Sequence, residues 1–271
     1  RIRLIRGLAL ALTADLIEDL PNRAARRRAA IELIEANGDL ASPDLDELGR
    51  LQVGLARSGL GEHRLAIRDL TALAADAAAT PRRRFEALAG IVTDIAAAED
   101  PDNALERLGS LRRRQLEEPG AAIFALPWAD LEHRLLVEDA IVRGGSRDAA
   151  RAASIGPWIA LIEDRPPLER EAVLDLALGR IRAAAPNEPD APAAVALAHA
   201  AAADERDFDA RRRLLESARD RAEEESVVRL VALRRLAQLE LEDQRWVPAI
   251  ESLRTLANTF PNEAQAEAAI D

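Results

Sequence analysis

Three histidines are the first candidates for chemistry in this sequence of 271 residues. They are His63, His133 and His199, and no two of them have the short spacing that metal ligands require. Cysteine is absent, which excludes thiolate nucleophiles and cysteine zinc sites. We therefore expect each histidine to be a solvated residue or a polar residue between helices. We expect no metal and no cofactor.

The glycines Gly54, Gly59 and Gly61 superficially suggest a phosphate-binding loop. They lack the following Lys-Ser/Thr and the preceding strand of such a loop, so roles in close helix packing and in a turn are preferred. The serines have no nucleophile-elbow context, and the carboxylates show no distinctive pairing for general acid-base catalysis. The sequence thus offers no catalytic residue, and we expect a protein that is not an enzyme.

Four arginine triplets could attract an anionic partner: 26–28, 82–84, 112–114 and 211–213. Three consecutive helical residues span about 200° of arc, so no triplet forms a single basic stripe. Each triplet also has a glutamate four residues after one arginine, and such pairs contribute about 0.2–0.5 kcal/mol. These pairs are Arg28–Glu32, Arg82–Glu86, Arg113–Glu117 and Arg212–Glu216. Because the formal net charge is −11, we expect solvated faces and no nucleic-acid partner.

Composition limits the remaining classes of protein. Charged residues make up 31% of the chain, and no apolar run reaches the length of about 18 residues that suggests a membrane span. The sequence therefore predicts a soluble protein without membrane insertion. Four Phe and three Trp are the only aromatic residues, too few for a base-stacking platform. Arginine replaces lysine throughout, as in proteins of GC-rich bacterial-like genomes, and the lack of cysteine does not distinguish cytoplasm from periplasm.

The N-terminal residues resemble a signal peptide only loosely. Arg1, Arg3 and Arg6 precede an apolar run from Gly7 to Ala14. Asp15 interrupts that run while the helical period continues, so an amphipathic first helix is the better interpretation. The chain has no methionine, so we expect a processed or truncated product unless modified residues are missing from the sequence.

The sequence predicts an all-α protein. Alanine, leucine, arginine and glutamate dominate, and no alternating β-branched run is long enough for a strand. Turn-forming residues interrupt the helical pattern at Pro21, Asn37-Gly38, Ser42–Asp44, Gly59–Gly61, Pro81, Asp100–Asn103, Pro119-Gly120, Pro127, Gly144–Ser146, Gly156-Pro157, Pro166-Pro167, Pro186–Pro192, Asp204–Asp207, Ser226, Gln244 and Pro261. Ser42 or Asp44, with Glu47 three residues after Asp44, suits a helix N-cap. Helices of about 12–18 residues joined by short turns favour antiparallel neighbours.

Small residues recur at a spacing of twelve. Ala237, Ala249 and Pro261 follow this spacing at the end of the chain, and Gly54 and Ala66 follow it near the start. A weaker match has Ala198, Ala210 and Leu214. Gly or Ala at these points lets two helices approach closely. The spacing therefore predicts repeated helical hairpins.

At these residues the sequence resembles the tetratricopeptide repeat family. The last unit carries the pattern as Leu236-Ala237, Trp246, Ala249, Leu253 and Pro261. It departs from the pattern at Glu240, where tyrosine is usual, and at Gln244, where glycine is usual. The resemblance implies a right-handed α-solenoid of antiparallel helix pairs. Its concave wall would include Arg234, Gln238 and Leu241, with Val195 and His199 in the preceding unit.

Such a wall favours a non-enzymatic scaffold that binds a peptide or a partner domain. Two alternatives stay open. The chain could be a structural part of a larger assembly that docks by its edge or terminal helices, because neither end has an obvious polar capping helix. It could also be a helical-repeat enzyme with an acidic cleft, which would need carboxylates that converge from different repeats.

Three segments follow from the pattern: helical repeats at 1–120, an irregular middle at 121–192, and repeats at 193–271. In the middle, prolines are dense and a short helix is expected from Pro157 to near Asp164. This segment is either a degenerate part of one array or a junction between two. No long polar linker separates the halves, which favours one continuous array.

Overall fold

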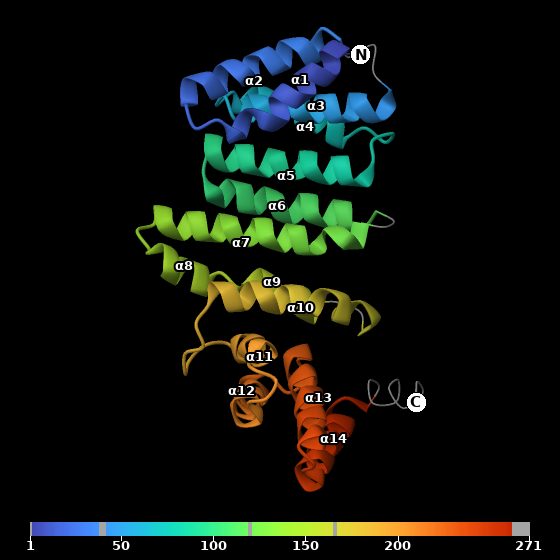
Figure 1. The fold of residues 1–271 in the computed structure, drawn as a ribbon, viewed down its shortest axis with the longest axis vertical. Helices are drawn as coiled ribbons and strands as arrows, with labels where there is room; N and C mark the ends of the chain where they lie inside the picture. The colour runs from blue at the N-terminus through green and yellow to red at the C-terminus, as the bar shows by residue number, and fades with distance from the viewer. Residues whose placement is uncertain (1, 38–41, 119–120, 165–166, 262–271) are drawn as a thin grey trace. The chain divides into compact units, whose positions relative to one another are not determined.

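A computed structural model describes residues 2–37, 42–118, 121–164 and 167–261, with side chains omitted at 167–172. These residues are helical throughout, joined by short turns, and contain no strand (Figure 1). The prediction of an all-α protein is confirmed. Residues with high helix propensity dominate the sequence, which explains why nearly every segment between turns is helical.

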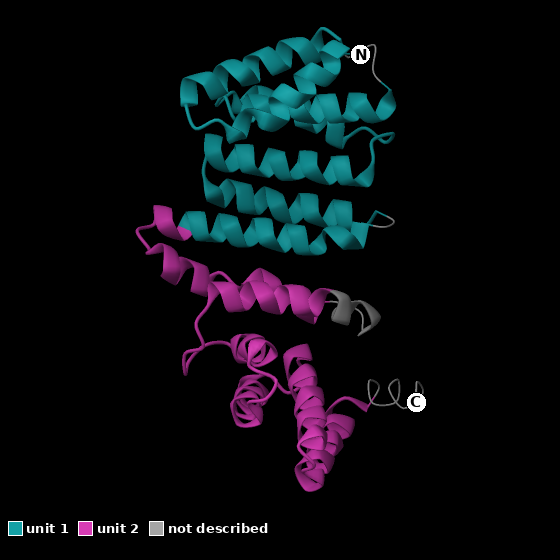
Figure 2. Cartoon of the chain, viewed as in Figure 1, with its two compact units in different colours: residues 1–139 teal, residues 140–271 magenta. Residues whose placement is uncertain are grey.

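The chain forms two compact units, 1–139 and 140–271 (Figure 2). The first contains α1 (Ile2–Thr13), η1 (Ala14–Leu16), α2 (Leu20–Glu35), α3 (Pro43–Ser58), α4 (His63–Ala74), α5 (Pro81–Ala98), α6 (Pro101–Leu116), η3 (Ala121–Phe124) and most of α7 (Ala125–Val142). The second contains α8 (Arg147–Ala153), α9 (Gly156–Glu163), α10 (Pro167–Ala184), α11 (Ala193–Ala202), α12 (Phe208–Arg221), α13 (Val227–Glu242) and α14 (Trp246–Thr259). The boundary lies within the irregular middle at 121–192, and the continuity of the array stays a prediction.

Local sequence determines where most helices begin. Five N-cap side chains accept a hydrogen bond from the backbone N–H three residues later: Thr80, Asp100, Ser146, Asp207 and Ser226. These bonds satisfy N–H groups that have no partner within the helix. Prolines lie in the first turn of α2, α3, α5, α6 and α9, where a missing N–H costs nothing. The short helix predicted from Pro157 is confirmed as α9.

Two local predictions were wrong. Pro127 does not interrupt a helix, because α7 begins at Ala125 and the proline lies in its first turn. Of the two predicted N-cap residues, Ser42 is the one at the start of α3, and Glu47 does not take part in capping this helix. Glu47 is 8% exposed, and it accepts hydrogen bonds from the backbone N–H and the hydroxyl of Thr80, at 3.1 and 3.2 Å. The Glu47 carboxylate, which the sequence assigned to a helix cap, is therefore used in a tertiary contact with Thr80.

Each unit is built from helices that pack on their neighbours in sequence. In residues 1–139, α1 packs on α2, α2 on α3, α3 on α4, α4 on α5 and α5 on α6, and α3 also contacts both α1 and α5. In residues 140–271, α10 packs on α11, α11 on α12, α12 on α13 and α13 on α14, and α11 also contacts α13. Alternate helices therefore touch as well as consecutive ones.

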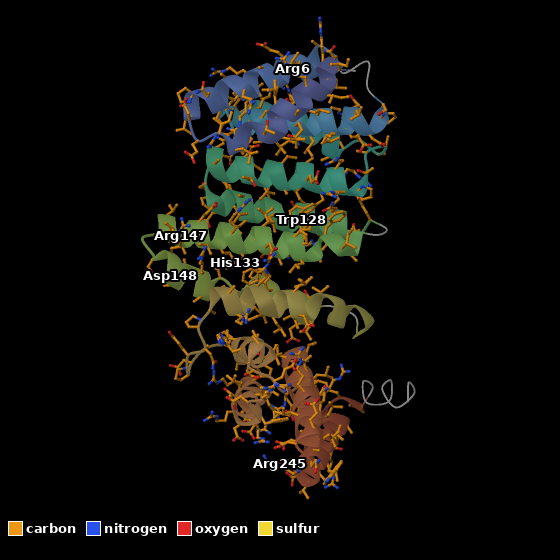
Figure 3. All side chains as sticks on the ribbon, viewed as in Figure 1. Arg6, Trp128, His133, Arg147, Asp148 and Arg245 are labelled. Carbon is orange, nitrogen blue, oxygen red and sulfur yellow. The ribbon has the colours of Figure 1, made fainter. Side chains whose placement is uncertain are left out.

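The core of the first unit contains an aromatic cluster. Trp128 is fully buried on α7 (Figure 3) and donates its indole N–H to Oε1 of Gln115 at 2.7 Å. Phe85 stacks on Phe124 with ring centroids 4.9 Å apart and meets Trp128 edge-on at 5.3 Å. Three of the seven aromatic residues are thus used in packing within the first unit.

Candidate partner-binding site

The sequence placed a candidate site on two helices of the second unit. On α11, Val195 is fully buried and therefore cannot contact a partner, which corrects its assignment to the concave wall. The reason is that α10, α12 and α13 all pack against this short helix. His199 on the same helix is half-buried, and its Nε2 lies 3.1 Å from the carbonyl oxygen of Ala185. That contact makes it a polar residue between helices.

The three candidates on α13 remain accessible to different degrees. Arg234 is half-buried and has an interaction partner within the protein. Gln238 is exposed and donates its side-chain N–H to Oε1 of Glu242 at 2.9 Å. Leu241 is 41% exposed. The accessible part of this helix is therefore centred on Gln238.

Two hollows flank α13. The first, of about 520 Å³, lies between α10, α11 and α13 and is lined by Asp175, Leu178, Gly179, Arg182, Ala198, Ala201, Ala202 and Arg235. The second, of about 530 Å³, lies between the α11–α12 turn, α12 and α13 and is lined by Glu205, Arg206, Phe208, Arg211, Gln238 and Glu242. Arg235, Gln238 and Glu242 lie three and four residues apart on one side of α13, which we call the α13 face. This face borders both hollows.

The first hollow combines small apolar residues with two arginines. Arg235 donates through Nη2 to Oδ1 of Asp175 at 3.0 Å. Arg182 is exposed and has no ion pair among the residues that the structure describes. A Cβ atom at Gly179 would meet no other atom within 4 Å, so the floor beside Arg182 is open. The hollow can therefore receive a small apolar side chain together with a carboxylate.

The second hollow is electrostatically balanced. It is lined by two arginines and two glutamates. Arg211 forms a long ion pair of 4.0 Å with Glu242 and donates to the carbonyl oxygen of Glu205 at 3.3 Å. Phe208 supplies a half-buried apolar surface. The geometry suits an uncharged polar or apolar segment more than a charged group.

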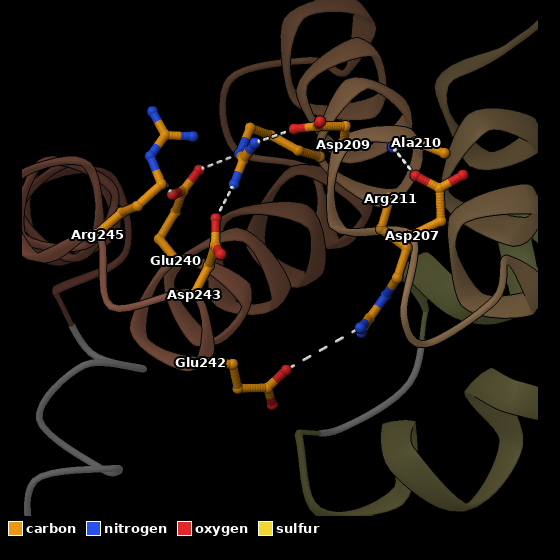
Figure 4. Close-up of polar contacts among 9 residues, drawn as sticks. Asp207, Asp209, Ala210, Arg211, Glu240, Glu242, Asp243 and Arg245 are labelled. Atoms are coloured by element: carbon orange, nitrogen blue, oxygen red, sulfur yellow. Dashed lines mark hydrogen bonds and ion pairs between the residues drawn. The ribbon is translucent and has the colours of Figure 1, made fainter.

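A buried ion-pair network holds α12 against α13 (Figure 4). The Arg212 guanidinium donates to Oε1 of Glu240 at 2.7 Å, to Oδ2 of Asp243 at 2.7 Å and to Oδ1 of Asp209 at 2.6 Å. The side chains of Arg212 and Glu240 are 13% and 4% exposed. Burial lowers the pKa of Arg212, but its hydrogen bonds to Glu240 and Asp243 and their charges raise it above its ordinary value. The network fixes the rotation of α13, and so it positions the α13 face.

In the sequence, Glu240 stands out only as a departure from the tetratricopeptide repeat pattern. The available signal was its position three residues after Ala237 and four after Leu236, on the buried side of α13. A carboxylate on that side needs a buried cation, and Arg212 is the one that α12 supplies. Arg245 adds a second, longer contact of 3.4 Å to Oε2 of Glu240.

Another polar contact joins two helices of the first unit. Nδ1 of His63 lies 2.8 Å from Oδ1 of Asp94, which is fully buried on α5. This pair links α4 to α5. Among the described residues, no group of three His, Asp or Glu side chains is arranged to hold a metal ion. The acidic side chains Asp175 and Glu242 beside the hollows are paired with arginines.

The arginine triplets are used mainly in contacts within the protein. Arg82 pairs with Glu86 at 2.9 Å, as the sequence predicts. Arg84 and Arg112 pair with Glu118 and Glu132. Arg212 pairs across helices as well, whereas Arg28, Arg113, Arg114 and Arg213 are exposed.

Comparisons with known proteins provide no family. No protein-family model matches the sequence, and no curated protein matches it significantly. Among the described residues, no helix combines the length and the apolar character needed to cross a membrane.

Proposed function

We propose that this chain is a non-enzymatic scaffold that binds a peptide along the α13 face. The proposal includes a right-handed α-solenoid of antiparallel helix pairs, as the resemblance to tetratricopeptide repeats implies. The contacts between alternate helices, α1 with α3, α3 with α5, and α11 with α13, support this arrangement within each unit. A stack of hairpins leaves one helix of each pair facing a continuous surface, where a peptide can lie.

The observation that carries the proposal is the pair of hollows that share the α13 face. Arg182 and the open space above Gly179 favour a peptide with a carboxylate next to a small apolar side chain. A guanidinium binds such a carboxylate through charge-assisted hydrogen bonds. The neutral second hollow would receive the following residues, beside Gln238.

The experiment is selection of peptides from a random library on the immobilised full chain, followed by affinity measurements with purified variants. We expect enrichment of Asp or Glu beside Ala, Val or Ser. Arg182→Glu should weaken binding by about 10- to 100-fold, the range for a hydrogen bond to a charged group. Gly179→Leu should block the first hollow, because its side chain enters open space without disturbing the core.

Gly109→Leu is the matched control, because Gly109 is also helical and a Cβ atom at this position would likewise meet no other atom within 4 Å. It should leave peptide affinity unchanged. Replacing the acidic residue of the selected peptide with arginine should restore binding to Arg182→Glu. If Gly179→Leu binds the selected peptides as tightly as the natural chain does, the first hollow is not the binding site.

A second candidate function is a structural role in a larger assembly, with docking by a terminal helix. The observation that favours it is an exposed apolar stripe on α14, formed by Trp246, Ile250 and Leu253 at 61%, 54% and 45% exposure. These residues lie on one side of the helix. If Ile250→Glu with Leu253→Glu abolishes association with a partner protein while Gly179→Leu does not, docking through α14 replaces the peptide groove.

A further inference from the structure

Helix α1 is apolar on two opposite sides. Leu4, Gly7, Leu8 and Ala11 are buried and face α2 and α3. The other side carries Ile2, Ile5, Ala9 and Leu12, with Leu16 at the end of η1, and we call these five residues the α1 stripe. The four large side chains of the stripe are 85%, 55%, 58% and 80% exposed. A helix that is apolar on both sides is normally covered on both, so the stripe marks an interaction surface.

The charges around the α1 stripe are separated by sign. Arg3 and Arg6 are exposed near its N-terminal end, and Figure 3 labels Arg6 on α1. Asp15, Glu18 and Asp19 are exposed at its C-terminal end. Asp15 already pairs with Arg27 of the same chain, and Arg23 donates to the carbonyl oxygen of Ile17 at 2.8 Å, so the two carboxylates of Glu18 and Asp19 outnumber one remaining arginine at this end. The surface therefore has a basic end and an acidic end.

The α1 stripe is also nearly symmetrical about its middle residue. Ile2 and Leu16 lie seven residues on either side of Ala9, and Ile5 and Leu12 lie four and three residues away. A small residue at the centre lets two helices cross closely. In an antiparallel pair, each apolar residue would meet an apolar residue, and each basic end would meet an acidic end. A parallel pair would instead place like charges together.

We propose that the α1 stripe binds the α1 stripe of a second copy of this chain, antiparallel, about a two-fold axis near Ala9. Such an interface is isologous, because the same surface serves both copies. Charge complementarity selects a second copy over an arbitrary apolar partner, since the chain carries both halves of the pattern. Five side chains per copy make a small interface, so the dimer is expected to be transient, with a dissociation constant of about micromolar or weaker. This surface is separate from the α13 face and does not depend on the proposed function.

The first test is sedimentation equilibrium of the full chain over a range of concentrations. The natural chain should show a reversible monomer–dimer equilibrium. Ile5→Glu with Leu12→Glu should be monomeric at the same concentrations, and its circular dichroism should match that of the natural chain because both residues are exposed. Leu176→Glu is the matched control: Leu176 is 60% exposed on α10, and its replacement should leave the dimer intact.

The second test uses the charges. Arg3→Glu with Arg6→Glu makes both ends acidic, and Glu18→Arg with Asp19→Asn makes both ends basic while keeping a good N-cap residue for α2. Each variant alone should dimerise at least 10-fold more weakly than the natural chain. An equimolar mixture should form a heterodimer, because an acidic end then meets a basic one.

The third test sets the orientation and exploits the absence of native cysteine. When oxidised alone, the Ile2→Cys variant and the Leu16→Cys variant should each form few disulfides. When the two variants are mixed and oxidised, they should form a disulfide-linked heterodimer. Three results would overturn the proposal: a natural chain that stays monomeric, unchanged dimerisation of the Ile5→Glu, Leu12→Glu variant, or preferential links between identical positions. Monomeric chain that binds vesicles with anionic lipid, and loses this binding in the same variant, would assign the stripe to a membrane surface instead.

Discussion

At the scale of single residues, Arg212 on α12 binds three carboxylates, and two of them, Glu240 and Asp243, connect it to α13. Glu240 is nearly inaccessible to water, and its pairing with Arg212 replaces the hydration that both groups lose. Breaking such a pair from one side leaves an uncompensated charge, whereas removing both charges does not. The ion-pair network can therefore be tested by comparing the removal of one charge with the removal of both.

We predict that Arg212→Met and Glu240→Leu each lower the free energy of unfolding by about 3 kcal/mol, the low end of the range for a broken buried pair, because Arg212 keeps some hydration. The double variant should lie within about 1 kcal/mol of the natural chain. Urea unfolding followed by circular dichroism measures all four proteins. Additive losses in the double variant would mean that the two charges do not depend on each other.

Asp76 is a residue whose protonation should affect stability. A hydrogen bond from Arg50 at 2.6 Å lowers its pKa below the ordinary value of 3.8, and the backbone N–H of Ala78 at 3.0 Å lowers it further, against a smaller opposing effect of burial. Because the folded-state pKa is lowered, the stabilisation is complete above pH 3.8 and is lost as the pH falls through the folded-state value.

We therefore predict that Asp76→Asn lowers the urea midpoint at pH 7, and that its difference from the natural chain shrinks as the pH falls below 3.8. Urea titrations between pH 7 and pH 3 provide the measurement. In an Arg50→Met background the substitution should have a much smaller effect. A pH-independent difference between the natural chain and Asp76→Asn would contradict the role of the Arg50 contact.

At the scale of helices, glycine acts in two opposite ways. A Cβ atom at Gly54 on α3 would lie 2.5 Å from Cδ2 and 2.7 Å from Cγ of Leu70. Leu70 cannot move aside, because it is fully buried and a Cβ atom at Gly90 would lie 2.8 Å from its Cδ1. Gly179 on α10 faces open space instead. The small residue predicted at Gly54 is therefore required for the approach of α3 to α4.

We predict that Gly54→Ala lowers the free energy of unfolding by about 1–3 kcal/mol through overpacking. Gly179→Ala should raise it by roughly 0.5–1 kcal/mol, because alanine favours the helix and meets no obstacle. Thermal unfolding of the two variants compares the effects directly. Because the two variants are expected to change stability in opposite directions, each serves as the control for the other. If Gly54→Ala stabilised the chain, α3 and α4 would approach each other less closely than these distances require.

The turn between α13 and α14 contains a strained residue. Gln244 has φ of 56°, in the left-handed region that glycine adopts most easily. The resemblance to tetratricopeptide repeats implies glycine at this position, and Gln244 adopts a φ angle that glycine favours. The turn therefore holds a non-glycine residue in a conformation that costs backbone energy.

We predict that Gln244→Gly stabilises the chain by about 1 kcal/mol, because glycine relieves the left-handed strain. Gln244→Val should destabilise it, because a β-branched residue is disfavoured at positive φ. The melting temperatures of the two variants provide the test. If Gly and Val at this position give the same stability, the backbone does not hold a left-handed conformation here.

At the scale of the whole molecule, charge governs what the chain can bind. The net charge is −11, and arginines of the triplets pair with carboxylates across helices. Binding to nucleic acid depends on a concentrated basic surface that displaces counterions from phosphates. Of the two arginines that line the first hollow, Arg235 is paired with Asp175 and only Arg182 is exposed, which suits a single carboxylate better than a phosphate backbone.

We predict that the chain does not retain duplex DNA or single-stranded RNA on a filter at about 0.15 M salt, where screening is strong beyond about 8 Å. Arg182→Glu should not alter that result. Retention that falls steeply with salt would contradict the prediction and would indicate that the arginine triplets bind nucleic acid.

Much of the secondary structure follows from the sequence alone. Helix-forming residues, N-cap side chains and first-turn prolines act within a few residues, so Ser146, Ser226 and Pro157 mark helix starts wherever the helices pack. The twelve-residue spacing also identified Ala66 and Ala249, and both are fully buried. These features depend on local conformation and on side-chain size, which the sequence states directly.

Tertiary structure decided which residues meet. Val195 became core and Glu47 bound Thr80, although both had plausible local roles. Arg212 is four residues before Glu216 in sequence, yet it binds Glu240, because a buried carboxylate gains more from a guanidinium than a solvated one does. The hollows beside α13 and the charge pattern around the α1 stripe likewise depend on the helices that leave each surface uncovered. Burial and long-range pairing arise only when distant helices pack, so local spacing cannot determine them.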